Sequence, residues 1–172
     1  MFKLRSAVLA LTLGLTAAGT AAAQAADAGP RRSNTFFVEL GGNAILYSLN
    51  GEHFFTPKAG LRVGAGYVGV GEDDGAGSAD VLLVPVMGTY LLGEGNHHFE
   101  VGAGLGYATA HVETTDVDTD IERGSTVCGT ATFGYRYQKP TGGVMFRAGF
   151  TPMIFSGGSI LPWVGLGVGY AF

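Results

Sequence analysis

The end of the chain alternates strictly between bulky apolar and very small side chains. Val164, Leu166, Val168, Tyr170 and Phe172 occupy every second position, and glycine or alanine fills the positions between them. Successive side chains of a β-strand point to opposite faces, so one face here is bulky and apolar while the other is nearly bare. A strand needs this pattern when one face touches lipid and the other faces a cramped barrel interior. The segment therefore predicts a membrane-spanning β-strand.

The beginning of the chain predicts a secretory signal peptide. Lys3 and Arg5 precede an apolar stretch over residues 7–18, and small residues gather at 21–25. These match the charged, apolar and cleavage regions of a signal peptide. The stretch is shorter than a membrane anchor, which needs about 20 apolar residues. We therefore expect a signal peptide over residues 1–25 with cleavage near 23–25, a short N-terminal segment over 26–34 and a barrel over 35–172. The cleavage region has no cysteine, which excludes a lipoprotein anchor.

Composition fits a single small β-domain. The 172 residues include 30 glycines, and only 14% of the residues are charged. After the signal peptide, no apolar segment is long enough for a membrane helix, so a membrane protein of this sequence must cross with strands. The formal net charge of −4 becomes −6 when the two positive charges Lys3 and Arg5 are lost, so no nucleic-acid partner is expected. The single cysteine, Cys128, is expected to be a free thiol.

Alternating apolar runs and their connectors predict the order of the strands. The connectors 91–96 and 139–142 are short and rich in turn-forming residues, whereas 69–79 and 114–124 are longer and acidic. Membrane barrels likewise have short turns at one end and longer loops at the other. Six strands follow: 59–69, 80–92, 97–113, 125–138, 143–155 and 160–172.

The segment 35–55 is too long for one strand, because a tilted strand crosses the bilayer with about 9 to 11 residues. Its apolar residues occupy even positions up to Leu40 and odd positions from Ile45 onward. Gly42 and Asn43 lie at the break, and Gly-Asn pairs favour the positive φ of a tight hairpin. We predict two strands, 35–41 and 45–54; one long strand with a bulge is the alternative. The predicted fold class is all-β, an eight-stranded antiparallel transmembrane β-barrel.

Charge and bulk lie on opposite faces of these strands. One face carries residues such as Leu61, Phe99, Phe133 and Phe146 and no charge. The opposite face holds mostly Gly, Ala, Ser and Thr, together with all the charged residues of the strand cores. A soluble β-sandwich would show the reverse, with its charges on the outer face. Six charged residues are therefore predicted to point into the barrel: Glu39, Glu52, Arg62, Glu100, Arg136 and Arg147.

These interior charges balance, since three are acidic and three are basic. We expect one layer of Arg–carboxylate pairs, because the guanidinium fork matches a carboxylate in geometry and charge. Small eight-stranded barrels fill their interior with side chains, so the layer is interpreted as a structural plug that locks strand register. A polar path through the barrel is the alternative.

Several segments carry a family resemblance: 39–43 (ELGGN), 46–50 (LYSLN), 134–138 (GYRYQ), 146–152 (FRAGFTP) and 162–166 (PWVGL). They resemble a family of outer-membrane β-barrel proteins without an assigned activity, which share the architecture of small OmpA- and OmpX-like barrels. The resemblance covers nearly the whole mature chain, and it implies the fold and the outer-membrane location. We expect a monomeric barrel in the outer membrane of a Gram-negative bacterium. Its partners would be outer-membrane lipid and the barrel assembly machinery.

The end of the last strand also resembles the assembly signal of outer-membrane barrels. The residues that would form this signal are Leu166, Val168, Tyr170 and Phe172. By this resemblance, Phe172 belongs at the periplasmic rim. The short turns then lie in the periplasm and the acidic connectors outside, as in bacterial barrels with an even number of strands.

No catalytic, cofactor or metal site is expected. Lipid A deacylases are also eight-stranded barrels, but two residues after His111 their pattern requires Ser, and Glu113 stands there. Residues 116–120 resemble the start of a calcium loop, whose sixth and twelfth positions are here Ile121 and Val127 instead of Gly and Glu. We expect a structural or surface-interaction role without catalysis. The alternative is a narrow channel or small-solute transporter, and an outer-leaflet lipid enzyme comes third.

Overall fold

A computed structural model describes residues 33–71, 77–114 and 121–172 of the chain. The predicted signal peptide lies outside these residues and stays a prediction. The centres of the two acidic connectors, residues 72–76 and 115–120, also lie outside them. Among the described residues, no helix is long and apolar enough to cross a membrane.

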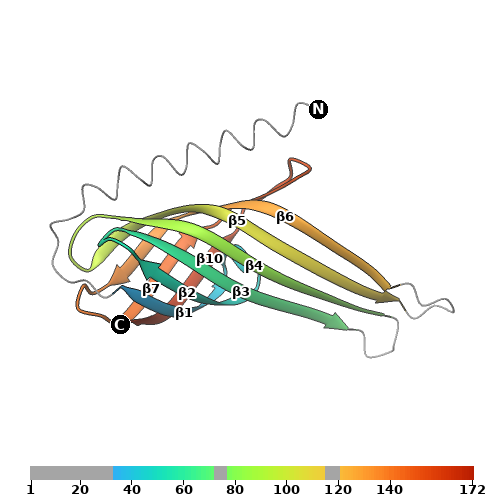
Figure 1. The fold of residues 1–172 in the computed structure, drawn as a ribbon, viewed down its shortest axis with the longest axis horizontal. Helices are drawn as coiled ribbons and strands as arrows, with labels where there is room; N and C mark the ends of the chain where they lie inside the picture. Colours follow the sequence, from blue (N-terminus) through green and yellow to red (C-terminus); the bar gives the residue numbers. More distant parts are fainter. Residues whose placement is uncertain (1–32, 72–76, 115–120) are drawn as a thin grey trace.

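All strands belong to one antiparallel sheet that closes on itself (Figure 1). From β1 to β7 each strand pairs with the next in the chain, β8 pairs with β6 and β9, and β10 pairs with β7 and with β1, which closes the barrel. The elements are β1 (Asn34–Gly41), the short 3-10 helix η1 (Gly42–Ala44), β2 (Tyr47–Phe54), β3 (Ala59–Gly71), β4 (Gly77–Leu92), β5 (His97–Thr114), β6 (Ile121–Gln138), β7 (Gly143–Phe150), β8 (Met153–Phe155), β9 (Ile160–Leu161) and β10 (Val164–Ala171).

Two of the wall strands are interrupted by prolines. β7 and β8 pair with β6 in one continuous register and are separated only by Thr151 and Pro152. Similarly, Pro162 and Trp163 separate β9 from β10. Proline has no N–H to donate to a ladder, which explains both interruptions. Counting each interrupted pair once gives an eight-stranded antiparallel β-barrel, and the predicted fold class is confirmed.

The two ends of the barrel differ. At the terminal end, the backbones of Asn34 and Phe172 exchange hydrogen bonds of 3.1 and 2.9 Å, and short connections join the strands. The opposite end is called the loop end. There the wall is uneven, because β1 and β2 have 8 residues each whereas β5 and β6 have 18. β2 pairs with β3 only as far as Ala65, so β3 to β6 extend past β1 and β2 (Figure 1).

The segment 35–55 forms two strands, as predicted, but the connection between them differs from a tight hairpin. Gly41 and Gly42 have positive φ, and η1 and two further residues follow, so β2 begins at Tyr47 and not at residue 45. The helix folds into the barrel, where Asn43 and Ala44 are only 1 and 2% exposed. The alternative of one bulged strand is therefore wrong.

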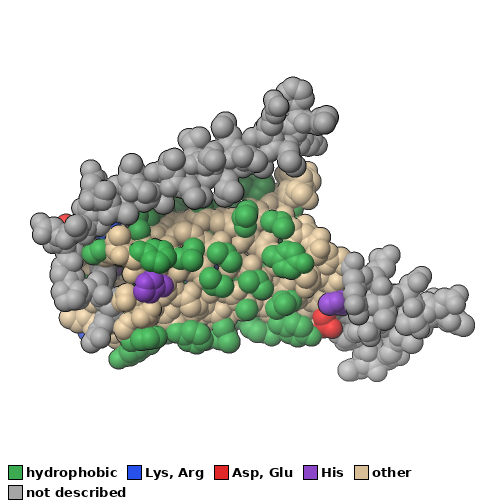
Figure 2. Space-filling view, viewed as in Figure 1, with side chains coloured by type: hydrophobic (Ala, Val, Ile, Leu, Met, Phe, Trp, Pro, Cys, Tyr) green, Lys and Arg blue, Asp and Glu red, His purple; other side chains and the backbone are tan. Residues whose placement is uncertain are grey.

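Period-two alternation divides the wall into an apolar outer surface and a packed interior. Most of the large apolar side chains that point outward from β1, β3, β5 and β10 are 41–66% exposed. Examples are Leu40, Val63, Phe99 and Leu166. Figure 2 shows hydrophobic side chains spread along the visible wall, with a histidine and an acidic side chain near the loop end and another histidine toward the terminal end. Inside, glycines allow close packing: a Cβ at Gly134 would lie 2.3 Å from the carbonyl oxygen of Ala148.

Candidate functional site

Six strands each contribute one charged side chain to the interior. Glu39 lies on β1, Glu52 on β2, Arg62 on β3, Glu100 on β5, Arg136 on β6 and Arg147 on β7. Each has the parity opposite to the apolar outer residues of its strand, which directs it inward. All six are between 0 and 5% exposed. The structure therefore places every charged residue singled out from the sequence in one interior cluster.

The six side chains form a single chain of alternating charge. Arg62 pairs with Glu39 at 3.7 Å, and Glu39 also pairs with Arg147 at 3.0 Å. Arg147 then meets Glu100 at 2.8 Å, and Glu100 meets Arg136 at 3.3 Å. Finally, Arg136 pairs with Glu52 at 2.5 Å. Every charge in this lumenal charge chain has an opposite charge beside it, as buried ions require.

Strand register explains two of these contacts. Glu39, Gly167 and Arg147 lie in one row across β1, β10 and β7. Gly167 has no side chain, and a Cβ there would lie 2.7 Å from Cγ of Arg147, so the glycine leaves the space through which Arg147 reaches Glu39. Arg136 and Arg147 are also direct neighbours in register. Glu100 binds both, which offsets their mutual repulsion.

Neutral polar groups bind the ends of the charge chain. Arg62 donates to Oδ1 of Asn43 and to the sulfur of Met87 at 3.2 Å. At the other end, Thr89 donates to Glu52 at 2.6 Å, and Arg136 donates through Nε to Gln138 at 2.8 Å. Charge-assisted hydrogen bonds of this kind satisfy buried ions beyond their ion pairs.

Two buried phenylalanines lie against the guanidinium groups. Phe37 has its ring centroid 5.7 Å from Cζ of Arg62 and 5.3 Å from Cζ of Arg147. Phe54 lies 5.1 Å from Cζ of Arg136. Both arrangements are cation–π contacts, which gain strength where the cation is removed from water. The cluster is thus a packed core with charges inside it.

Sequence reasoning missed the neutral members of this cluster. Phe37, Thr89 and Gln138 share the inward parity of Glu39, Met87 and Arg136, so the alternation rule could have found them. Asn43 carries no such signal, because it lies in a turn where the period-two rule does not apply.

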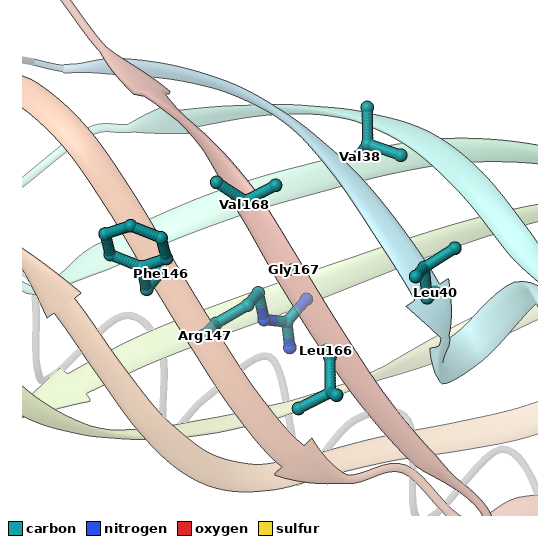
Figure 3. A pocket seen from close by; sticks show the side chains of 7 residues that line it. All are labelled: Val38, Leu40, Phe146, Arg147, Leu166, Gly167 and Val168. Carbon is teal, nitrogen blue, oxygen red and sulfur yellow. The ribbon is translucent and has the colours of Figure 1, made fainter.

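The outer surface near Arg147 carries an apolar groove across the seam where the barrel closes. Val38, Leu40, Phe146, Leu166 and Val168 line it, and Gly167 and Arg147 form its floor (Figure 3). All five lining side chains belong to the apolar outer surface of β1, β7 and β10. This surface is suited to contact with hydrocarbon chains.

The residues of the predicted assembly signal all point outward. Leu166, Val168, Tyr170 and Phe172 are 62, 52, 57 and 55% exposed. They form a continuous apolar ridge on β10 that ends at the terminal end of the barrel. Their role in assembly stays a prediction.

The histidines are dispersed. At the terminal end, His97 hydrogen-bonds to Tyr135 at 2.6 Å and His53 to Asn34 at 2.8 Å, whereas His98 is buried and His111 is exposed toward the loop end. Within residues 33–71, 77–114 and 121–172, no three His, Cys, Asp or Glu side chains form a group that could hold a metal ion. The charge chain is therefore the candidate site.

The fold is similar to two known bacterial barrels. One is the N-terminal β-barrel domain of Pseudomonas aeruginosa OprF, with a TM-score of 0.56 and 21% identity over 83% of this chain and 98% of that one. The other is Ail, the attachment invasion locus protein of Yersinia pestis, with a TM-score of 0.51 and 13% identity over 81% of this chain and 94% of that one. No family model and no curated protein matches the sequence. At these identities the likeness concerns the fold, and the chain has the fold of small eight-stranded outer-membrane barrels.

Proposed function

We propose that the protein is a monomeric outer-membrane barrel with a structural or surface-interaction role and no catalytic activity. The observation that carries this proposal is the inverted distribution of side chains. The wall is apolar outside, while all six charges of the strand cores lie inside and pair with one another. Such a surface is stable only where hydrocarbon surrounds the barrel, and the pairing of β1 with β10 closes the sheet so that neighbouring strands satisfy each other's backbone groups.

The charge chain supports a closed lumen in preference to a channel. A conducting pore needs charges that face water and exchange partners with passing ions. Here Arg136 and Glu100 are 0 and 1% exposed, and their partners are protein groups. The charge chain thus fills the barrel and connects β1, β2, β3, β5, β6 and β7 across the lumen.

The loop end would face the cell exterior. Residues 69–79 and 114–124, which comprise the ends of β3 to β6 and the connectors between them, carry seven acidic residues and one basic residue, Arg123. A structure of Ail contains the heparin analogue sucrose octasulfate. Because like charges repel, we do not expect the acidic loop end of this barrel to bind such a polyanion; a cationic or polar surface partner fits it better.

The orientation is tested with epitope tags. Tags inserted at Gly75, Thr119 or Gly157 are expected to bind antibody on intact cells, because all three lie in connectors at the loop end. A tag at Thr141, in a connection at the terminal end, is expected to bind antibody only after the outer membrane is permeabilised. Labelling of Thr141 alone on intact cells would invert the orientation.

The closed lumen is tested by single-channel recording. The refolded mature barrel in a planar bilayer is expected to show no stable conductance steps at neutral pH, because the charge chain occupies the lumen. Bilayers that receive the same detergent without protein serve as the control. Regular, repeatable steps from this protein would favour the narrow channel over the structural role.

A further inference from the structure

The turn between β1 and β2 folds into the lumen of the barrel. Asn43 and Ala44 of η1 are almost fully buried, although they connect two strands at the end of the barrel. Ala44 packs in a cluster with Leu83 of β4 and Ala108 of β5. On β3, a Cβ at Gly66 would lie 2.6 Å from that of Ala44, so the wall provides space for the turn.

Asn43 holds the tip of the turn to the far wall. Its Nδ2 donates to Oγ1 of Thr130 and to the carbonyl oxygen of Ala131 at 3.1 Å, both on β6. Its Oδ1 accepts from Thr132 at 3.2 Å and from Arg62. One buried side chain thus connects the turn to β6, to β3 and to the end of the charge chain.

The base of the turn is strained. Ile45 has φ of 72° and ψ of −76°, and the N–H of Leu46 donates to the carbonyl oxygen of Ala44 at 3.1 Å. This is the γ-turn conformation of positive φ, which is rare and strained, above all for a β-branched residue. On the other side, Gly41 and Gly42 have φ of 70 and 73°, values that glycine adopts without strain. The turn therefore has two points where the backbone direction changes sharply, and one of them is occupied by a residue that disfavours it.

A single side chain outside the turn holds this strained point. Nε1 of Trp163, in the interruption between β9 and β10, donates to the carbonyl oxygen of Ile45 at 2.7 Å. The Asn43 contacts and the Trp163 contact thus oppose the strain at Ile45. Strained residues persist only where surrounding contacts hold them, and they are frequent in elements that switch between two states.

We propose that residues 41–46 form a hinged plug, with Gly41 and Ile45 as its hinges and Asn43 and Trp163 as its two latches. In the closed state the plug fills the loop-end half of the lumen. In the open state the turn swings out, Ile45 relaxes, and the inward side chains of β6 near Thr130 become accessible from the loop end. This movement goes beyond the proposed structural role, because it gives the barrel a second state while the charge chain below the plug stays intact.

We expect the single cysteine of the chain to report on this movement. Cys128 lies on β6, one inward position from Thr130, and is 1% exposed. The experiment measures the rate of maleimide labelling of Cys128 in the refolded, full mature barrel in detergent micelles. Circular dichroism, and the difference in electrophoretic mobility between heated and unheated samples, verify that each variant is folded.

Three variants test the proposal. Asn43→Ala combined with Trp163→Phe removes both latches and is expected to raise the labelling rate at least tenfold. Ile45→Gly relieves the strain while it keeps the latches, and it is expected to lower the rate about tenfold, the factor that corresponds to about 1.4 kcal/mol of strain. Lys139→Ala, in an exposed turn at the terminal end, is expected to label at the original rate.

The opposite signs of the two effects make the test decisive. A folded double variant that labels at the original rate would overturn the proposal. So would Ile45→Gly labelling as fast as the original or faster. If the double variant does not fold, Ile45→Gly alone decides, because glycine fits the backbone at this position. These outcomes do not depend on where the barrel resides or on its conductance, so the proposed structural role can fail or stand separately.

Discussion

Arg147→Ala is expected to lower the free energy of unfolding of the refolded barrel by about 3 to 5 kcal/mol. Arg147 is the central cation of the charge chain and binds Glu39 at 3.0 Å and Glu100 at 2.8 Å. Its removal leaves two separate groups: a neutral pair of Arg62 and Glu39, and a triad in which Arg136 alone faces Glu100 and Glu52. That triad carries one uncompensated negative charge in a site shielded from water. Urea unfolding in detergent micelles measures the loss.

The ion pairs of the charge chain also predict which second substitution restores stability. In the Arg147→Ala background, Glu100→Gln neutralises the charged triad and should recover part of the loss. Glu39→Gln should recover less, because it leaves Arg62 without a carboxylate. Measuring Glu100→Gln and Glu39→Gln also in the unmodified barrel gives the coupling energy of each with Arg147, which only interacting residues show. Lys139→Ala, in an exposed turn, serves as the control and should change stability little.

One combination of results would contradict the interpretation that the charge chain closes the lumen. If Arg147→Ala unfolds like the unmodified barrel and also raises ion conductance, water fills the lumen and screens the remaining carboxylates. The narrow channel would then replace the structural role.

Removal of Phe172 is expected to cause the second large effect, a loss of most of the protein from the outer membrane with accumulation in the periplasm. Phe172 ends the outward apolar ridge of β10 and is 55% exposed, so its ring is available to a partner during assembly. Phe172→Lys retains the backbone hydrogen bonds to Asn34 and changes only the side chain. Because the predicted signal requires the aromatic ring, we expect this variant to act similarly to the deletion. Cell fractionation and immunoblotting measure the distribution.

A matched control distinguishes recognition of Phe172 during assembly from a general effect of replacing an exposed phenylalanine by a charged residue. Phe55 lies in a connection at the same end and is 68% exposed, yet it lies outside the ridge. Phe55→Lys is therefore expected to reach the outer membrane at nearly normal levels. Refolding in detergent should be similar for Phe172→Lys and the unmodified chain, because few native contacts are lost. Normal outer-membrane levels of both Phe172 variants would show that assembly does not use the terminal residue.

The alternation of the sequence was sufficient to predict the barrel and the inward direction of its charges. Side chains of a strand alternate with a period of two, so the parity of Arg62 or Arg136 fixes the face on which each lies. No knowledge of the neighbouring strands is needed for that step. The same rule would also have identified Thr89 and Gln138 as interior residues.

The partners within the charge chain depend on closure of the barrel. Glu52 and Arg62 lie directly opposite each other on β2 and β3, and adjacent strands alone would favour that pair. Instead, Glu52 pairs with Arg136 of β6 at 2.5 Å, and Arg62 pairs with Glu39 of β1 at 3.7 Å. Long side chains in a narrow lumen reach strands that are not their neighbours. The choice among partners therefore follows from the curvature and stagger of the closed sheet.

The inward fold of the β1–β2 turn was likewise decided by tertiary structure. The sequence predicted that the chain reverses near Gly41 and Gly42, because glycines and the change of parity mark the end of a strand, although one long strand with a bulge was the alternative. It did not determine whether the turn extends outward or enters the lumen. That direction depends on groups distant in the chain: Thr130 and Thr132 satisfy the amide of Asn43, Gly66 provides space for Ala44, and Trp163 binds the carbonyl of Ile45. A buried amide is stable only where all these partners converge, and only the closed barrel brings them together.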